Sequence, residues 1–209
     1  MKRTDFHPAE EYDDPVAAAT DWTCLTSGST NLHAYRIKRI SPLLYMCKPS
    51  WSNIAFQSSF ILMGLAGILS GVYIQVYQVS NVPLPALITI FALGVIFLGV
   101  GSLMGGYMLQ TTRFDKSNNQ LRSSRRAWLK RLRLSQEPEV IPLEDIYALQ
   151  LLIFNGDLDG SSYTGHELNA ILKTAERVSL FSTGADPEIQ VEIAELAEFL
   201  EVPVWVANS

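Results

Sequence analysis

Residues 54–77 read IAFQSSFILMGLAGILSGVYIQVY, and residues 84–109 read LPALITIFALGVIFLGVGSLMGGYML. A helix needs about 20 mostly apolar residues to cross about 30 Å of hydrocarbon, and both stretches reach that length. Polar residues and two prolines separate them. The sequence therefore predicts a membrane hairpin of two helical spans. It lies within residues 49–112, which contain no Asp, Glu, Lys, Arg or His.

The charged residues lie in blocks on either side of this segment. Residues 1–21 carry a net charge of −4, residues 22–48 of +4, residues 113–134 of +7 and residues 135–209 of −12, giving the net −5 of the 209-residue chain. A soluble domain needs polar groups on its solvated faces. An uncharged segment of 64 residues therefore argues against a wholly soluble enzyme.

The positions of the basic residues predict how the hairpin is oriented. The connection at 78–83 has no Lys or Arg, whereas four basic residues lie at 36–48 and five lie at 113–126. Basic residues near the ends of spans are retained on the cytoplasmic side of a membrane. Both termini are therefore expected in the cytoplasm.

Glycines recur at a spacing of four residues in both spans. Gly67 and Gly71 form one such pair, and Gly101 and Gly105 form another. Small residues let helix backbones approach closely in lipid, where burying apolar side chains between helices gains little. We expect these glycines to pack the hairpin on itself, with docking onto another protein's spans as the alternative. The spans have no ionisable residue, which argues against a proton relay or a transporter site.

The chain after the hairpin has the pattern of short strands. Turn-forming residues between Phe114 and Leu121 predict a strand hairpin, and the apolar run at 147–153 predicts a buried strand. The segment at 155–162 is rich in Asp, Gly and Ser and predicts a loop. Alternating apolar and polar residues at 166–173 predict a half-buried strand, and another strand is expected at 177–182.

One amphipathic helix is expected to close this domain. Asp186 is a good N-cap and Pro187 a good first helical residue, and apolar residues follow at helical spacing up to Leu200. Antiparallel strands closed by one C-terminal helix form a small α+β domain of the pleckstrin-homology-like type. The expected organisation is an N-terminal cytoplasmic segment at 1–48, partly disordered, the hairpin at 49–112, and this cytoplasmic domain at 113–209.

A basic ribbon stands out at the start of this domain. The ribbon has three competing interpretations: it fixes topology, it binds anionic headgroups, or it docks an acidic protein. A fourth is that it faces the acidic helix of its own domain. Nucleic acid is not expected as a partner, because the following segment would repel phosphate. The candidate binding residues are Arg122, Arg125, Arg126, Trp128, Lys130, Arg131 and Arg133.

No motif predicts catalysis, a cofactor or a metal site. His166-Glu167 begins like a zinc-protease helix, but the second His is missing and the context is that of a strand. Cys24 and Cys47 have no clustered ligands and are expected to be ordinary reduced thiols. The segment at 157–161 opens like a calcium loop but lacks the closing Glu, so a solvated turn is expected.

Three short patches resemble a known family. RFDK at 113–116, PLEDI at 142–146 and AELAEFLEVPV at 194–204, after two spans, are similar to bacterial membrane-anchored pleckstrin-homology-like proteins. Within that group they resemble photosystem I assembly proteins with two spans. The resemblance implies a non-enzymatic, membrane-tethered domain in an inner (cytoplasmic) or thylakoid-type membrane.

These observations predict an integral membrane interaction or assembly protein. Its expected partners are the membrane itself and another membrane protein or complex, or anionic lipid headgroups. An immunity or inhibitor protein embedded in the membrane is the alternative. A subunit of a membrane enzyme or transporter is less favoured, since no intramembrane charge or catalytic constellation is present.

Overall fold

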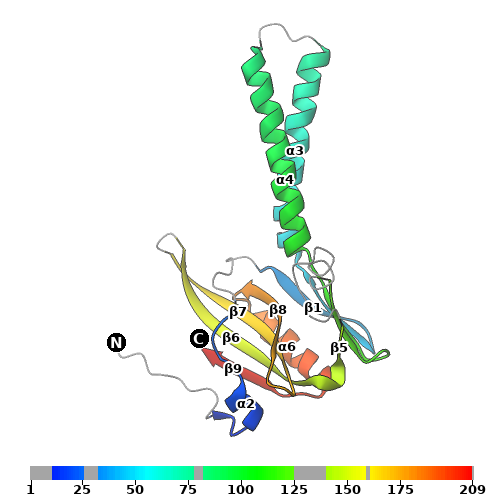
Figure 1. Cartoon of the computed structure of the whole chain (residues 1–209), viewed down its shortest axis with the longest axis vertical. Coiled ribbons are helices and arrows are strands. Elements are labelled where there is room, and N and C mark those ends of the chain that lie inside the picture. The colour runs from blue at the N-terminus through cyan, green and yellow to red at the C-terminus, as the bar shows by residue number, and fades with distance from the viewer. Residues whose placement is uncertain (1–10, 26–32, 78–81, 125–139, 159–160, 209) are drawn as a thin grey trace. The chain divides into compact units, whose positions relative to one another are not determined.

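The chain divides into two compact units in a computed structural model. The structure describes residues 11–25, 33–77, 82–124, 140–158 and 161–208. One unit is Trp51–Leu109, and the other combines Met1–Ser50 with Gln110–Ser209. Figure 1 shows the first unit as two long helices and the second as strands with one principal helix.

The first unit consists of helix α3, Trp51–Val76, and helix α4, Leu84–Met108. Both helices are long and apolar enough to cross a membrane. The helix ends lie within three residues of the predicted spans at 54–77 and 84–109. Pro83 and Pro85 stand at the start of α4, where a missing backbone N–H costs nothing.

The first sheet of the other unit, sheet A, contains five antiparallel strands in sequential order. Each strand pairs with the next one along the chain. In the pair formed by the second and third strands, Cys47 lies opposite Thr112. The two long helices are inserted in the chain between the second and third strands. The strands are β1 Tyr35–Ser41, β2 Leu44–Pro49, β3 Thr112–Asp115, β4 Gln120–Ser123 and β5 Val140–Pro142.

This pairing changes the domain boundaries drawn from the sequence. The sequence predicts a separate N-terminal segment at 1–48 and the cytoplasmic domain at 113–209. The structure instead places β1 and β2 in the same sheet as β3, because their backbone groups and apolar faces find partners there. The sheet domain is therefore formed by chain from both sides of the hairpin.

The second sheet, sheet B, has the order β8-β7-β6-β9. The short 3-10 helix η1, Leu143–Asp145, leads into it. Strand β9 follows the main helix and pairs parallel to β6. The prediction that the helix is the last element of the domain is therefore wrong. The strands are β6 Ile146–Leu158, β7 Ser161–Leu172, β8 Arg177–Gly184 and β9 Val204–Asn208.

The predicted loop at 155–162 is wrong. Strands β6 and β7 continue as a long hairpin in which Gly156 pairs with Tyr163. The Tyr163 ring occupies the space that a Cβ atom at Gly156 would need. Pairing with the neighbouring strand has therefore overridden the local turn preference of Asn, Gly and Asp.

The main helix, α6, is Pro187–Leu200 and begins as predicted at its Asp186 cap, whose side chain accepts a hydrogen bond from the Glu188 N–H. Glu201 ends the helix in the left-handed conformation. Helix α6 buries its apolar stripe in a core that both sheets share. The core includes Ile37, Tyr45, Phe114, Leu121, Ile141, Leu149, Leu151, Leu168, Phe181, Ile189, Ile193 and Leu196.

The opposite face of sheet B is covered by residues 11–25, which we call the N-terminal strap. The strap contains the short helix α2, Pro15–Ala19, capped by Asp14. Figure 1 shows α2 beside the end of β9. Ala17 is fully buried there with Trp205 and Ile171. Because of this cover, β7 is buried on both faces rather than half-buried as predicted.

Candidate interaction surfaces

The outer face of sheet A carries four basic residues, Lys38, Lys48, Arg113 and Arg122, which we call the basic face. In β3, Phe114 is buried in the core and Arg113 is exposed, as strand alternation requires. The register sets Lys38 opposite Met46, Met46 opposite Arg113 and Arg113 opposite Arg122. These side chains therefore form a row across four strands.

The basic face is an electrostatically unfavourable arrangement by itself. Arg113 and Arg122 are direct cross-strand neighbours, and like charges in that position destabilise a sheet. Among the described residues of this face, one is acidic, namely Asp115. Its carboxylate accepts hydrogen bonds from Asn118 and Ser117, and the Asn118 side chain chiefly lowers its pKa. The positive charges of Lys38, Lys48 and Arg113 on this face can attract an anionic surface.

The predicted basic ribbon is only partly within the described residues. Arg122 lies in β4 and belongs to the basic face. The ribbon residues Arg125, Arg126, Trp128, Lys130, Arg131 and Arg133 lie outside the described residues.

Sequence reasoning missed the other members of the basic face. In the sequence, Lys38, Lys48 and Arg113 indicate only the orientation of the hairpin. The alternation in 35–49, with buried Ile37, Tyr45 and Cys47, was the available signal.

The glycine pairs of the hairpin differ in their surroundings. A Cβ atom at Gly67 would lie 3.1 Å from the Gly94 Cα, and one at Gly71 would lie 2.7 Å from the Phe91 ring. Gly101 faces Ile61 in the same way, at 2.9 Å. These three glycines lie against the other helix, whereas the nearest atom to a Cβ at Gly105 would be 3.8 Å away.

Within α3 and α4, the most crowded of the described glycines was not among those predicted. A Cβ atom at Gly64 would lie 2.7 Å from the backbone nitrogen of Leu98 and 2.8 Å from the Gly94 carbonyl oxygen. Gly99, by contrast, has nothing within 4 Å of its Cβ position. The close approach of α3 and α4 therefore depends on Gly64 as well as on the predicted positions.

The acidic helix α6 is paired with Arg36 of sheet A, which does not belong to the ribbon. Arg36 of β1 lies 2.9 Å from Asp186 and 2.8 Å from Glu188. Glu192 accepts a hydrogen bond from the Ile37 N–H at 2.6 Å, which satisfies a backbone donor on the edge of the sheet. Burial raises the pKa of Glu192 despite these contacts.

A hollow of about 670 Å³ lies between the β1–β2 turn and the second half of α6. Its aromatic side chains, Tyr45 and Phe199, have ring centroids 4.6 Å apart. Lys116 and Arg39 contribute positive charge to its lining, and helix α6 contributes two carboxylates. The sequence did not reveal this hollow, because its residues come from three separate segments.

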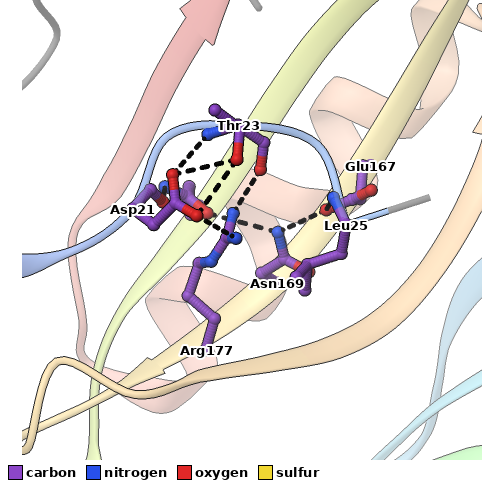
Figure 2. A network of polar contacts seen from close by, with 7 residues as sticks. Asp21, Thr23, Leu25, Glu167, Asn169 and Arg177 are labelled. Atoms are coloured by element: carbon purple, nitrogen blue, oxygen red, sulfur yellow. Dashed lines mark hydrogen bonds and ion pairs between the residues drawn. The ribbon is translucent and has the colours of Figure 1, made fainter. Parts of the chain in front are cut away.

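The N-terminal strap is held on sheet B by polar contacts, which Figure 2 shows from close by. Arg177 of β8 lies 3.0 Å from the Asp21 carboxylate. The Leu25 N–H donates to the Glu167 carboxylate at 3.1 Å, and the Asn169 side chain donates to the same oxygen at 2.8 Å. Glu167 is fully buried, so these donors offset the cost of removing its carboxylate from water.

Tyr12 of the strap contacts the outer edge of sheet B. Its hydroxyl accepts a hydrogen bond from the Val206 N–H at 2.7 Å and donates to the Val206 carbonyl at 3.1 Å. Val206 lies in β9, which is an edge strand of that sheet. The strap therefore satisfies backbone groups that an edge strand would leave open. No sequence signal linked Tyr12 to a residue so distant in the chain.

The residues considered for metal or redox chemistry lie apart. His166 is a strand residue in β7 and is 4% exposed, with its pKa lowered chiefly by burial. Cys24 lies in the strap and Cys47 in β2, and both are free thiols. Within the described ranges, no group of three or more His, Cys, Asp or Glu side chains could hold a metal ion.

Comparisons with known proteins add no assignment to this geometry. No family model matches the chain, and no curated protein matches it.

Proposed function

We propose that this protein is an integral membrane interaction protein. In this proposal α3 and α4 span the membrane, and both termini face the cytoplasm. The sheet domain docks onto an acidic surface through the basic face. We propose that this surface is formed by the anionic headgroups of the surrounding membrane. The alternative is an acidic partner protein, and the experiment below distinguishes the two.

The exposed side chains of the helices support the membrane anchor. Leu62, Leu69, Leu84 and Leu103 are all more than half exposed, although each is apolar. Exposing so much apolar surface to water is unfavourable, at roughly 25 cal/mol per Å². Hydrocarbon covers such a surface without cost, and the uncharged sequence of both helices suits that environment.

The architecture of the sheet domain supports a pleckstrin-homology-like arrangement. Two sheets share a core with an amphipathic helix, which is the arrangement expected from the resemblance of the three sequence patches. Strand β9 is an addition to the expected pattern, since it follows the helix and extends sheet B. The domain thus resembles a binding module more than an enzyme, and we propose no catalytic role.

The observation that carries the proposal is the position of the basic face in the chain. Only Ser50 separates β2 from α3, and only residues 109–111 separate α4 from β3. Lys48 and Arg113 are therefore three and five residues from the nearest helix ends. Each basic residue held near an anionic membrane surface contributes about 1 kcal/mol of attraction.

The test places a polarity-sensitive fluorophore on the basic face of the full chain. Gln120 is an exposed residue on the same face of β4 as Arg122, so Gln120→Cys carries the label in a Cys24→Ser background. The protein is reconstituted into neutral vesicles or into vesicles that contain anionic lipid. We expect a shift of the emission to shorter wavelength only with anionic lipid, and salt should reverse it.

Two matched double variants identify the responsible charges. Lys38→Gln with Arg113→Gln should weaken docking about 30-fold, the equivalent of about 2 kcal/mol. Arg3→Gln with Lys173→Gln removes the same charge from elsewhere in the chain and should preserve docking. Equal shifts in all variants would contradict the role of the basic face. A co-purifying membrane protein lost only with Lys38→Gln and Arg113→Gln, without any lipid shift, would assign the face to a protein.

A further inference from the structure

The hollow beside α6 combines an aromatic surface with charged walls. Tyr45 is 5% exposed, and its ring packs against Phe199. No hydrogen bond joins the Tyr45 hydroxyl to another described residue, and Tyr45 lines the hollow, so a ligand there can supply the partner that tyrosine hydroxyls usually find. The charged and aromatic residues of the lining determine the chemistry of the hollow. They are Arg39, Tyr45, Lys116, Glu195, Glu198 and Phe199.

The aromatic surface already holds one cation of the protein itself. The Lys116 ammonium lies 5.0 Å from the centroid of the Phe199 ring, within the range of a cation–π contact. The same ammonium lies 2.8 Å from the Glu201 carboxylate. The charge of Lys116 is therefore neutralised by its own neighbour. It does not balance the other carboxylates of the hollow.

The carboxylates of α6 give the hollow an excess of negative charge. Glu195 and Glu198 are exposed, and neither forms an ion pair with a described basic residue. They lie in the second half of α6, where the helix dipole adds partial negative charge at the C-terminal end. Arg39 is the remaining positive group of the lining, and it likewise has no ion pair within the described residues. Two unpaired negative charges thus face one unpaired positive charge.

We propose that this hollow binds a basic side chain, Arg or Lys, presented by a segment of a partner protein. Glu195 and Glu198 bind the cationic group, and the Tyr45 hydroxyl accepts a hydrogen bond from it. Arg39 binds a carboxylate of the same segment. The proposal rests on the proposed function in one respect, that a protein is among the partners, but it uses none of the residues of the basic face.

The charges distinguish this site from an anion site. A phosphate or carboxylate placed next to Tyr45 would meet the two carboxylates of α6 and the negative end of the helix dipole. A cation meets favourable charge from both of those sources and a favourable aromatic face. A partner segment with one basic and one acidic side chain can pair with the carboxylates of α6 and with Arg39.

The test measures binding of a defined peptide to the full chain in neutral detergent by calorimetry. The probe is acetyl-Asp-Gly-Arg-amide, and its control has citrulline in place of arginine, which keeps the shape and removes the charge. We expect saturable binding of the arginine peptide and at least tenfold weaker binding of the citrulline peptide, since a charge-assisted hydrogen bond is stronger than a neutral one.

Matched variants then locate the site. Glu195→Gln with Glu198→Gln should weaken binding about tenfold or more, while Glu144→Gln with Glu176→Gln removes two exposed carboxylates elsewhere and should leave the affinity unchanged. Tyr45→Phe keeps the ring and should weaken binding several-fold. Thermal unfolding of each variant checks that the fold is intact.

Three results would overturn the proposal: no binding of the arginine peptide to the parent protein, equal affinity for the citrulline peptide, or equal loss in both double variants. The vesicle experiment on Lys38 and Arg113 is independent of these residues. Failure of the peptide test therefore leaves the proposed membrane docking standing, and failure of the vesicle test leaves the hollow standing.

Discussion

At the scale of single residues, Cys47 and Cys24 differ in their access to solvent. Cys47 is fully buried in the shared core, and burial raises the pKa of its thiol far above the ordinary value. Cys24 is partly exposed in the strap. The thiolate is the reactive form, so the folded protein has one accessible thiol and one inert one.

We expect an alkylating reagent to modify Cys24 in the native protein and Cys47 only when the domain unfolds. The protection of Cys47 should follow the free energy of unfolding, which is about 5–15 kcal/mol for a typical domain. Peptide mapping by mass spectrometry after timed alkylation measures both rates. Comparable native rates for the two thiols would show that the core around β2 opens readily.

His166 should make the sheet domain sensitive to mild acid. Burial is the main cause of its lowered pKa, and Asp186 opposes the shift. At a pH just below about 6.5, His166 binds a proton in the unfolded chain but stays neutral in the folded protein. The free energy of unfolding should therefore fall as the pH drops from about 6.5 toward the lower pKa of the folded state.

Denaturation of the full chain in neutral detergent at a series of pH values tests this expectation. His166→Gln should flatten the dependence on pH in that window. His7→Gln, which removes another histidine of the chain, is the control and should preserve the dependence. An unchanged slope in His166→Gln would assign the acid sensitivity to other groups.

At the scale of elements, the hairpin offers two glycines with opposite surroundings. Gly64→Ala places a methyl group against the backbone of α4 and should force the helices apart, at a cost of about 1–3 kcal/mol. Gly99→Ala adds the same atom in open space and should be neutral or slightly stabilising. Thermal stability of the two variants in the same detergent measures the difference. Equal stability would mean that α3 and α4 do not pack as closely as described.

The orientation of the hairpin is tested at the connection between the helices. This connection lacks Lys and Arg, whereas the flanks are basic, so it is expected on the side away from the cytoplasm. Ser80→Cys in a Cys24→Ser background should react with a membrane-impermeant thiol reagent added to intact cells. Labelling that occurs only after the membrane is opened would reverse the proposed topology.

At the scale of the whole molecule, the two units should be separable. Strands β2 and β3 are antiparallel neighbours, with Cys47 opposite Thr112, so residues 50 and 110 come at the same end of the ladder. A short Asn-Gly turn can join such strands. Replacing residues 51–109 by this turn should give a soluble sheet domain that unfolds cooperatively.

Helix α6 gives this shortened protein an internal control. Leu196→Asp puts a carboxylate at a fully buried position and should cost several kcal/mol, comparable with the stability of the whole domain. Val191→Asp makes the same change at a position that is 62% exposed and should have little effect. Chemical denaturation compares them. Equal stability of both variants would show that α6 does not pack through its predicted stripe.

Local patterns in the sequence sufficed for elements whose causes are local. The long uncharged runs predicted α3 and α4, and the Asp186-Pro187 signal predicted the start of α6. Strands β1 and β2 escaped prediction, because their partner β3 lies beyond the hairpin in the chain. Pairing of that kind depends on tertiary contacts, which a local pattern does not contain.

The candidate surfaces were predictable only in part for the same reason. Arg122 was recognised by its charge, but its alignment with Arg113 and Lys38 depends on the register of four strands. The hollow around Tyr45 required α6 to lie beside β1. The contacts of the N-terminal strap, such as Asp21 with Arg177, join residues 156 positions apart.

If α3 and α4 anchor the protein in a membrane as proposed, the Tyr12 hydroxyl on the edge of β9 has a consequence for crowding there. Molecules anchored in one bilayer meet at high local concentration, and an open strand edge is a template on which a neighbouring chain can add its own strand. Val206 is at the middle of such an edge, and the Tyr12 hydroxyl occupies both of its backbone groups. We therefore expect this single phenol to hinder the addition of a neighbouring chain's strand at this edge.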